Sequence, residues 1–158
     1  MIVKEIRDED FTSYKKPSMV IGFPSCSWKC ERECGMRVCQ NSALAQAPDI
    51  EINIDDIVNR YLQNPITKAI IFGGLEPMDS WNDMVDLIDQ FRKYTEDEII
   101  VYTGYKMDEI CKKTYWLGNK YKNIIFKVGR FIPNQPSHYD EILGVKLASS
   151  NQYSEVIS

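Results

Sequence analysis

The sequence has a single histidine and no long apolar run. His138 is the only histidine among 158 residues, and no stretch approaches the roughly 20 consecutive apolar residues of a membrane-spanning helix. The chain begins MIVKEIRDEDF, which lacks the basic segment and the apolar segment of a secretory signal peptide. Internal repeats and low-complexity tracts are also absent. These absences predict a cytoplasmic protein that does not bind membranes, and we assign no chemistry to His138.

Basic residues are outnumbered by acidic ones. The chain has 19 lysines and arginines against 23 aspartates and glutamates, a formal charge of −4, and an isoelectric point near 5.1. This balance argues against a nucleic-acid-binding surface. No linker of distinct composition divides the chain, so we predict one domain over residues 1–158. A complete eight-unit α/β barrel needs about 250 residues, and the length excludes it.

Apolar runs that end in glycine alternate with segments of helical periodicity. The predicted strands are 18–24, 68–72, 98–102 and 123–128, and the predicted helices are 41–46, 55–62, 81–94 and 107–113. Near-continuous apolar strands that alternate with helices are typical of parallel βαβ units with right-handed crossovers. Together with an N-terminal β segment they predict an α/β fold. Composition leaves open whether it is an open partial barrel or a doubly wound sheet.

Four of the five cysteines lie within fourteen residues. Cys26, Cys30, Cys34 and Cys39 follow the first predicted strand, whereas Cys111 lies alone in a predicted helix, where we expect it to pack. In a reducing cytoplasm, clustered thiols indicate metal ligands rather than disulfides. Zinc sites usually combine C-x₂-C pairs with one another or with histidines, and neither occurs here. The spacing therefore favours an iron–sulfur cluster, with a structural zinc site and unmetallated thiols as alternatives.

Each predicted strand ends in residues suited to binding a ligand. The cysteines follow the first strand, and the others end in 73–77 (GGLEP), 103–105 (TGY) and 129–131 (GRF). The carboxyl ends of parallel strands are where α/β folds bind ligands. Gly73 and Gly74 would expose backbone to a ligand, Glu76 could order their loop, and the Thr103 hydroxyl could bond a ribose or a carboxylate. The alternatives are that Gly73 and Gly74 form an ordinary turn and that Thr103 is an ordinary strand-end residue.

These motifs, with the segment 144–152 (GVKLASSNQ), resemble the radical S-adenosylmethionine family, and within it the small activating enzymes of anaerobic ribonucleotide reductase. The resemblance implies an open partial (β/α) barrel. It also implies a 4Fe-4S cluster held by three cysteines, with S-adenosylmethionine as the second cofactor. Reductive cleavage of that cofactor would generate a glycyl radical on the partner. The implied partners are the catalytic subunit of the anaerobic (class III) reductase and a flavodoxin or ferredoxin-type electron donor.

The family motif C-x₃-C-x₂-C is matched only in part. Cys26 and Cys30 fit, but Glu33 stands at the third position. Cys39, followed by Gln40 and Asn41, resembles the last ligand of the family, which makes residues 31–36 an insertion of about one helical turn. Cys34 is the alternative third ligand. On one helix, thiols at positions 26, 30 and 34 would spread along about 12 Å of axis, so Cys39 is preferred.

Other family roles transfer to individual residues. Backbone carbonyls of Gly73 and Gly74 would contact the methionine amino group, with Glu76 beside them, and Thr103 or Tyr102 would approach the methionine carboxylate or the ribose.

Departures from the family leave further expectations open. Val38 replaces the aromatic residue before the last cysteine, so Trp28 or Phe23 would stack on the adenine, unless Trp28 simply packs. Val128 replaces an aspartate, and the adjacent Lys127 would either serve the cofactor carboxylate or point into solvent. The segment 149–152 would cap the site or form a polar tail.

Two alternatives have different requirements. A non-catalytic metal-binding or electron-transfer module would not need the glycine motif at 73–77. A radical enzyme acting on a small molecule, or on another glycyl-radical enzyme, is the second alternative. A small-molecule enzyme would need substrate-binding loops for which 158 residues leave little room.

Overall fold

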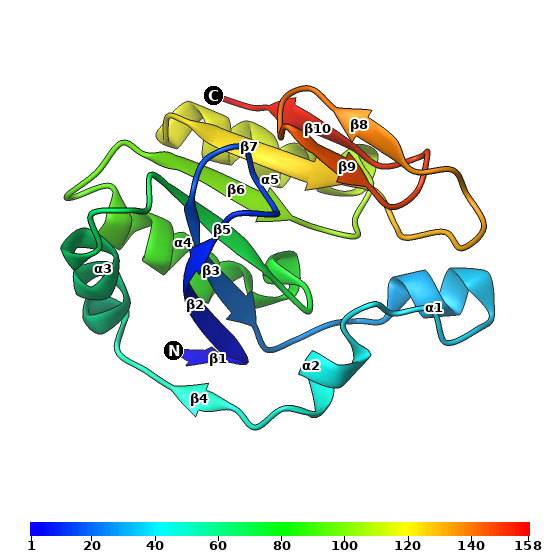
Figure 1. Cartoon of the computed structure of the whole chain (residues 1–158), viewed down its shortest axis with the longest axis horizontal. Coiled ribbons are helices and arrows are strands. Elements are labelled where there is room, and N and C mark those ends of the chain that lie inside the picture. The colour runs from blue at the N-terminus through cyan, green and yellow to red at the C-terminus, as the bar shows by residue number, and fades with distance from the viewer.

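A six-stranded sheet forms the centre of the computed structural model, which describes all 158 residues (Figure 1). The strand order is β10-β7-β6-β5-β3-β2. The four parallel strands are β3 (Ser18–Phe23), β5 (Ala69–Gly74), β6 (Glu98–Tyr102) and β7 (Ile124–Val128). Antiparallel β2 (Glu5–Asp10) and β10 (Tyr153–Val156) form the two edges. The predicted α/β fold with a mostly parallel sheet is confirmed, and the sheet does not close into a barrel.

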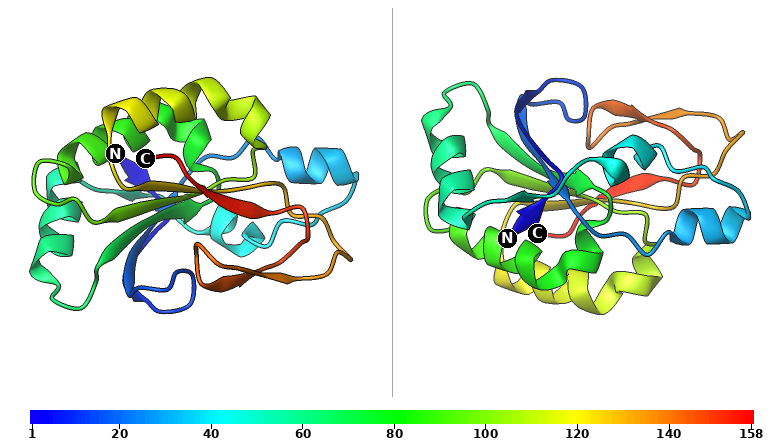
Figure 2. Two further views of the ribbon diagram at one scale, coloured as in Figure 1. Left: turned by 90° about the horizontal axis from the view of Figure 1, so that it is seen from above. Right: turned by 90° about the horizontal axis from the view of Figure 1, so that it is seen from below.

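Three helices pack on one face of this sheet, which we call the helix face (Figure 2). They are α3 (Ile54–Gln63), α4 (Trp81–Phe91) and α5 (Met107–Lys120). Their apolar residues share one core with alternate residues of the strands, such as Ile70 and Phe72. A doubly wound sheet would carry helices on both faces, so that alternative is wrong. No helix combines the length and apolar character needed to span a membrane.

Local sequence explains where the helices begin and end. The Asn53 side chain accepts a hydrogen bond from the Asp55 backbone N–H and caps α3. Helix α5 runs seven residues past its predicted end at 113, because Leu117 is fully buried in the core. The hydroxyl of Thr114 donates to the Ile110 carbonyl, so this buried polar group is satisfied within the helix.

The opposite face of the sheet, which we call the cavity face, has a smaller apolar core. Residues such as Ile71 and Ile100 are covered there by Tyr14, Leu143 and Leu147. Strands β8 (His138–Asp140) and β9 (Val145–Leu147) form a hairpin. Leu147 belongs to β9, and Leu143 lies in the connection between the two strands. No strand was predicted after 128, but β8, β9 and β10 all lie there. Each has only three or four residues, several of them polar.

Short elements complete the chain. Strand β1 (Ile2–Val3) pairs with β4 (Ile50–Glu51), and the 3₁₀ helix η1 (Pro77–Ser80) precedes α4. Helices α1 (Lys29–Cys34) and α2 (Ser42–Gln46) lie between β3 and β4. Helix α1 overlaps the expected insertion at 31–36 only over residues 31–34. In Figure 1 both helices lie beyond the carboxyl end of β3, away from α3 and α4.

Candidate functional site

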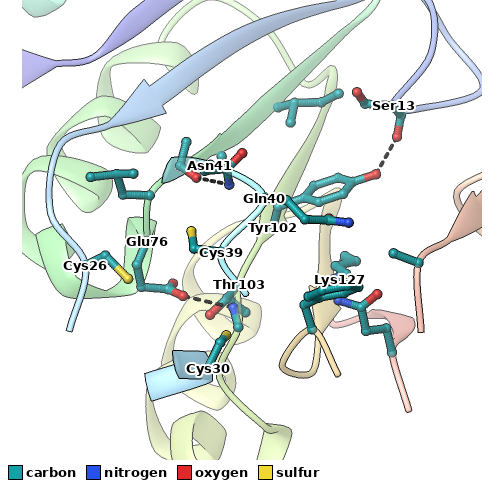
Figure 3. A pocket seen from close by; sticks show the side chains of 18 of the residues that line it. Ser13, Cys26, Cys30, Cys39, Gln40, Asn41, Glu76, Tyr102, Thr103 and Lys127 are labelled. Atoms are coloured by element: carbon teal, nitrogen blue, oxygen red, sulfur yellow. Dashed lines mark hydrogen bonds between the residues drawn. The ribbon is translucent and has the colours of Figure 1, made fainter. Parts of the chain in front are cut away.

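A cavity of about 410 Å³ lies at the carboxyl ends of the parallel strands (Figure 3). This size lies within the range of small-molecule sites, about 300–1,000 Å³. Every predicted site residue except Cys34 lines it: Cys26, Cys30, Cys39, Gly73, Gly74, Glu76, Tyr102 and Thr103. Trp28 also lines the cavity, whereas Phe23 is buried in the core of the helix face. The cavity therefore gathers residues that are widely separated in the sequence.

Hydrogen bonds to η1 and to the end of β5 hold the cysteine loop, residues 24–41. The Ser27 backbone N–H donates to Asp79 Oδ2 at 2.6 Å. At the other end of the loop, Asn41 Nδ2 donates to the Gly74 carbonyl at 2.7 Å. The anchors join the loop to the last residue of β5 and to the 3₁₀ helix η1 that follows it. The loop thus has a defined position over the cavity although none of its residues is fully buried.

Arg130 connects α1 to the rest of the rim. Its side chain is 3% exposed and forms a bidentate pair with Glu109 of α5, with Nη–Oε distances of 2.6 and 2.7 Å. Its Nε lies 2.9 Å from Glu33 Oε1 of α1. Bidentate guanidinium–carboxylate pairs fix orientation as well as distance. Arg130 therefore joins the cysteine loop to the end of β7 and the start of α5.

Three thiols open onto the cavity from this loop. Burial raises the pKa of Cys26 to about 11 and also raises the pKa of Cys30. Cys34, at the end of α1, does not line the cavity. This placement favours Cys39 over Cys34 as the third ligand, which stays a prediction.

The donor set fits an iron–sulfur cluster better than zinc. Thiolates are the ligands that such clusters take, and three cysteines face one space. No three histidine, cysteine, aspartate or glutamate side chains converge closely enough to hold a single metal ion. A zinc ion requires such convergence, whereas the cysteines of a cluster bind different irons.

The two glycines that end β5 are glycine for different reasons. Gly74 has φ +85°, and a Cβ there would lie 2.6 Å from Gly22 Cα and Phe23 N, so the packing of β5 against β3 requires glycine. At Gly73 a Cβ would meet nothing closer than 4.0 Å. The fold therefore does not require glycine at 73, where the open space belongs to the cavity.

Glu76 joins two strand-end loops beneath the cavity. It is 5% exposed, and its carboxylate accepts hydrogen bonds from the backbone N–H of Met78 at 3.1 Å and of Gly104 at 2.9 Å. Burial raises the pKa of Glu76 to about 7, with Asp79 adding to the rise, while hydrogen bonds from Thr103, Gly104 and Met78 oppose it. The expected loop-ordering contacts of Glu76 are present.

The hydroxyl groups of the two β6-end residues already have protein partners. Thr103 is 3% exposed, and its hydroxyl accepts a hydrogen bond from the Tyr105 backbone N–H. Tyr102 donates to the Ser13 carbonyl at 2.5 Å, as Figure 3 shows. Both residues form the cavity wall, and their predicted contacts with a cofactor stay predictions.

Lys127 is buried in the cavity wall. Only 8% of the residue is exposed, so the expectation of an outward, solvated lysine was wrong. It lies in β7, where every residue is buried, and it lines the cavity beside Tyr102 (Figure 3). Burial lowers its pKa to about 8, while Cys30 and Glu76 oppose this shift.

The segment 149–152 is part of the rim rather than a polar tail. Ser149 and Gln152 are buried. Gln152 Nε2 donates to the Gly129 carbonyl at 3.3 Å, and Asn151 Nδ2 donates to the Arg130 carbonyl at 2.8 Å. These bonds satisfy the backbone that follows β7, and Gln152 lines the cavity.

Sequence reasoning did not assign roles to Asn41 and Arg130, although both were in motifs that it quoted. The Asn41 anchor depends on a hydrogen bond across 33 residues, which no local pattern reveals. For Lys127 a signal was present. A lysine inside an apolar strand that is covered on both faces must be buried.

The sequence matches the family described as "4Fe-4S single cluster domain" over residues 19–152, most of the chain. Comparisons with curated proteins and with solved structures give no match. The matched range includes the whole cysteine loop and the four parallel strand ends that surround the cavity. The protein therefore belongs to the 4Fe-4S single cluster domain family, and its clustered cysteines are compatible with binding such a cluster.

Proposed function

We propose that this protein is a radical S-adenosylmethionine activase that generates a glycyl radical on an anaerobic ribonucleotide reductase. The observation that carries the proposal is the composition of the cavity. Three cysteine thiols share it with the unhindered backbone of Gly73 and with the end of β6. A site that only stored a cluster or passed electrons would need the thiols and not the adjoining space.

Different residues of the cavity would bind the cluster and the cofactor. Cys26, Cys30 and Cys39 would hold the cluster, and the Gly73 backbone would leave room for the methionine part of the cofactor. Glu76 orients the Gly104 loop through a 2.9 Å hydrogen bond. Trp28, which lines the cavity, would offer an aromatic face to the adenine.

The chemistry that a bound cluster would supply is one-electron reduction of the sulfonium, with the electron coming from a flavodoxin or ferredoxin-type donor. With both cofactors bound, this chemistry would release methionine and move one hydrogen atom from a glycine Cα of the reductase to the 5′-deoxyadenosyl group, which would leave as 5′-deoxyadenosine. The protein contributes binding, orientation and exclusion of water.

Features around the cavity support a protein as substrate. The six-stranded sheet has two edges and does not enclose the cavity. Thr12 and Lys146, both exposed, line the cavity and belong to different segments of the cavity face. A loop of a folded protein could enter between these segments and complete the site.

The proposal is tested on anaerobically purified protein reconstituted with iron and sulfide. We expect tight iron binding, visible absorption typical of thiolate-bound iron, and conversion of S-adenosylmethionine into 5′-deoxyadenosine and methionine after addition of a low-potential reductant. With the catalytic subunit of an anaerobic ribonucleotide reductase added, electron paramagnetic resonance should detect a glycyl radical. The Cys26→Ala variant serves as the negative control.

Different failures identify different alternatives. A reconstituted protein that binds iron and never cleaves the cofactor would be a metal-binding or electron-transfer module. Cofactor cleavage without a radical on any candidate reductase would contradict the proposed partner and would favour a small-molecule substrate or another glycyl-radical enzyme.

A further inference from the structure

Lys127 is a buried cation without an ionic partner. Its Nζ has no carboxylate oxygen within 4.0 Å, and its single hydrogen bond is a 3.4 Å contact with the Gly129 carbonyl. The Tyr102 ring centroid lies 5.9 Å from Nζ. A buried ammonium group is costly unless an anion or several acceptors compensate it. The fold therefore keeps a cation at this position that no carboxylate of the chain pairs with directly, although Glu76 and Cys30 act on it at longer range.

The other cations of the cavity are not in this situation. Arg7 lines the cavity but pairs with Asp10 at 2.8 Å and with Glu5 at 3.4 Å. Lys146 lines the cavity on β9 and is exposed, so water solvates it. Lys127 alone combines burial, access to the cavity and the absence of a carboxylate neighbour. A ligand that enters the cavity would meet this ammonium group.

From this placement we infer that Lys127 binds the carboxylate of the amino-acid part of the ligand, which for the function proposed above is the methionine carboxylate of S-adenosylmethionine. That cofactor carries a sulfonium and an ammonium group, and the carboxylate is its only anion. A buried lysine would repel the positive groups, so it favours the orientation that places the carboxylate at β7. Lys127 is thus a positioning residue that selects one orientation of an otherwise cationic ligand.

Binding measurements with two ligands test this inference. The reconstituted protein, kept oxidised so that no cleavage occurs, is titrated with S-adenosylmethionine and with its decarboxylated analogue, which lacks only the carboxylate. Lys127→Met should weaken binding of S-adenosylmethionine by about 10- to 100-fold, the range expected for a hydrogen bond between charged groups. Binding of the decarboxylated analogue should change little, because the analogue has no carboxylate for Lys127 to bind.

A matched variant separates a local contact from net charge. Lys112→Met removes the same charge from an exposed lysine of α5 outside the cavity, so it should change both affinities by less than about twofold. Thermal unfolding of each variant checks the fold. If Lys127→Met does not fold, Lys127→Gln removes the charge and keeps a polar end, with the same selective loss expected.

The outcomes distinguish the inference from the function on which it rests. Equal weakening for both ligands would give Lys127 a structural role only, and unchanged binding of S-adenosylmethionine would also overturn the inference. Either result leaves the proposed function intact if the wild-type protein binds and cleaves the cofactor. A wild-type protein that binds neither ligand would overturn both.

Discussion

The two faces of the central sheet are built from alternate residues of the same strands but are stabilised differently. On the helix face, α3, α4 and α5 bury one large apolar core. On the cavity face, the smaller core of eight buried residues gives way, toward the strand ends, to thiols, exposed backbone and the buried ammonium of Lys127. The comparison indicates that the helix face supplies stability and that the cavity face is free to carry polar groups for binding.

Removing individual thiols should have the largest effect on the cavity face. The alanine variants of Cys26, Cys30 and Cys39 should each lose essentially all bound iron after anaerobic reconstitution, because each removes a thiolate from a three-cysteine set. Analysis of iron and acid-labile sulfide measures this loss. Cys34→Ala and Cys111→Ala are the matched controls and should keep the wild-type content. If Cys34→Ala lost its iron while Cys39→Ala kept it, the order of preference for the third ligand would be reversed.

Truncating a core residue of the helix face should lower stability without changing the site. Phe91 is fully buried in α4 and packs edge-on against Tyr61 at 5.5 Å between ring centroids. Phe91→Ala should reduce the free energy of unfolding by about 3–5 kcal/mol, as measured by urea denaturation. The exposed Tyr94→Ala should shift it by less than about 0.5 kcal/mol. At temperatures where Phe91→Ala is folded, it should still bind iron. If the folded variant did not bind iron, the two faces would not act independently.

The adjacent glycines at the end of β5 allow a similar comparison. Gly74→Ala should cost about 2–4 kcal/mol of stability, because its Cβ would stand 2.6 Å from the β3 backbone at a positive φ. Gly73→Ala meets no such obstacle and should change stability by less than about 1 kcal/mol. Its methyl group would instead occupy the cavity and weaken binding of S-adenosylmethionine. Urea denaturation and equilibrium binding measure the two effects, and equal destabilisation by both variants would refute the distinction.

The helix face could be predicted from the sequence to a greater extent than the cavity face. Strong apolar periodicity located α3, α4 and the four parallel strands, because burial of those residues dominates their energetics. The end of α5 was missed because Leu117 packs in tertiary structure after a segment of weak helix formers. The strands after 129 were missed because three-residue strands with polar side chains carry little periodic signal.

Predicting the site depended on motif spacing rather than periodicity. The cysteines, the glycines and Glu76 were all placed at one cavity because parallel strands end at one edge of the sheet. The hydroxyl partners of Thr103 and Tyr102 could not be predicted, because they depend on loops whose conformations are set by distant contacts. The contact between Tyr102 and Ser13 spans 89 residues.

Acid should affect the hairpin on the cavity face more than the apolar core of the helix face. Asp140 of β8 accepts hydrogen bonds from the Ser154 hydroxyl at 2.5 Å and from the Leu143 and Ser154 backbone N–H groups at 2.9 Å. Burial alone would raise the pKa of Asp140, but these hydrogen bonds outweigh it and lower the pKa. These bonds hold the β8–β9 hairpin, whose residues Val145 and Leu147 line the cavity, against β10.

The sign of the pH dependence follows from this shift. Because the folded-state pKa of Asp140 lies below its value in the unfolded chain, near 4, the ionised carboxylate stabilises the fold above about pH 4 and this contribution is lost as the pH falls further. Asp140→Asn should therefore lower stability at pH 7 and flatten the decline below pH 4, and Ser154→Ala should do the same to a smaller extent. Urea denaturation at a series of pH values measures both, and a wild-type slope in Asp140→Asn would show that other carboxylates determine the acid sensitivity.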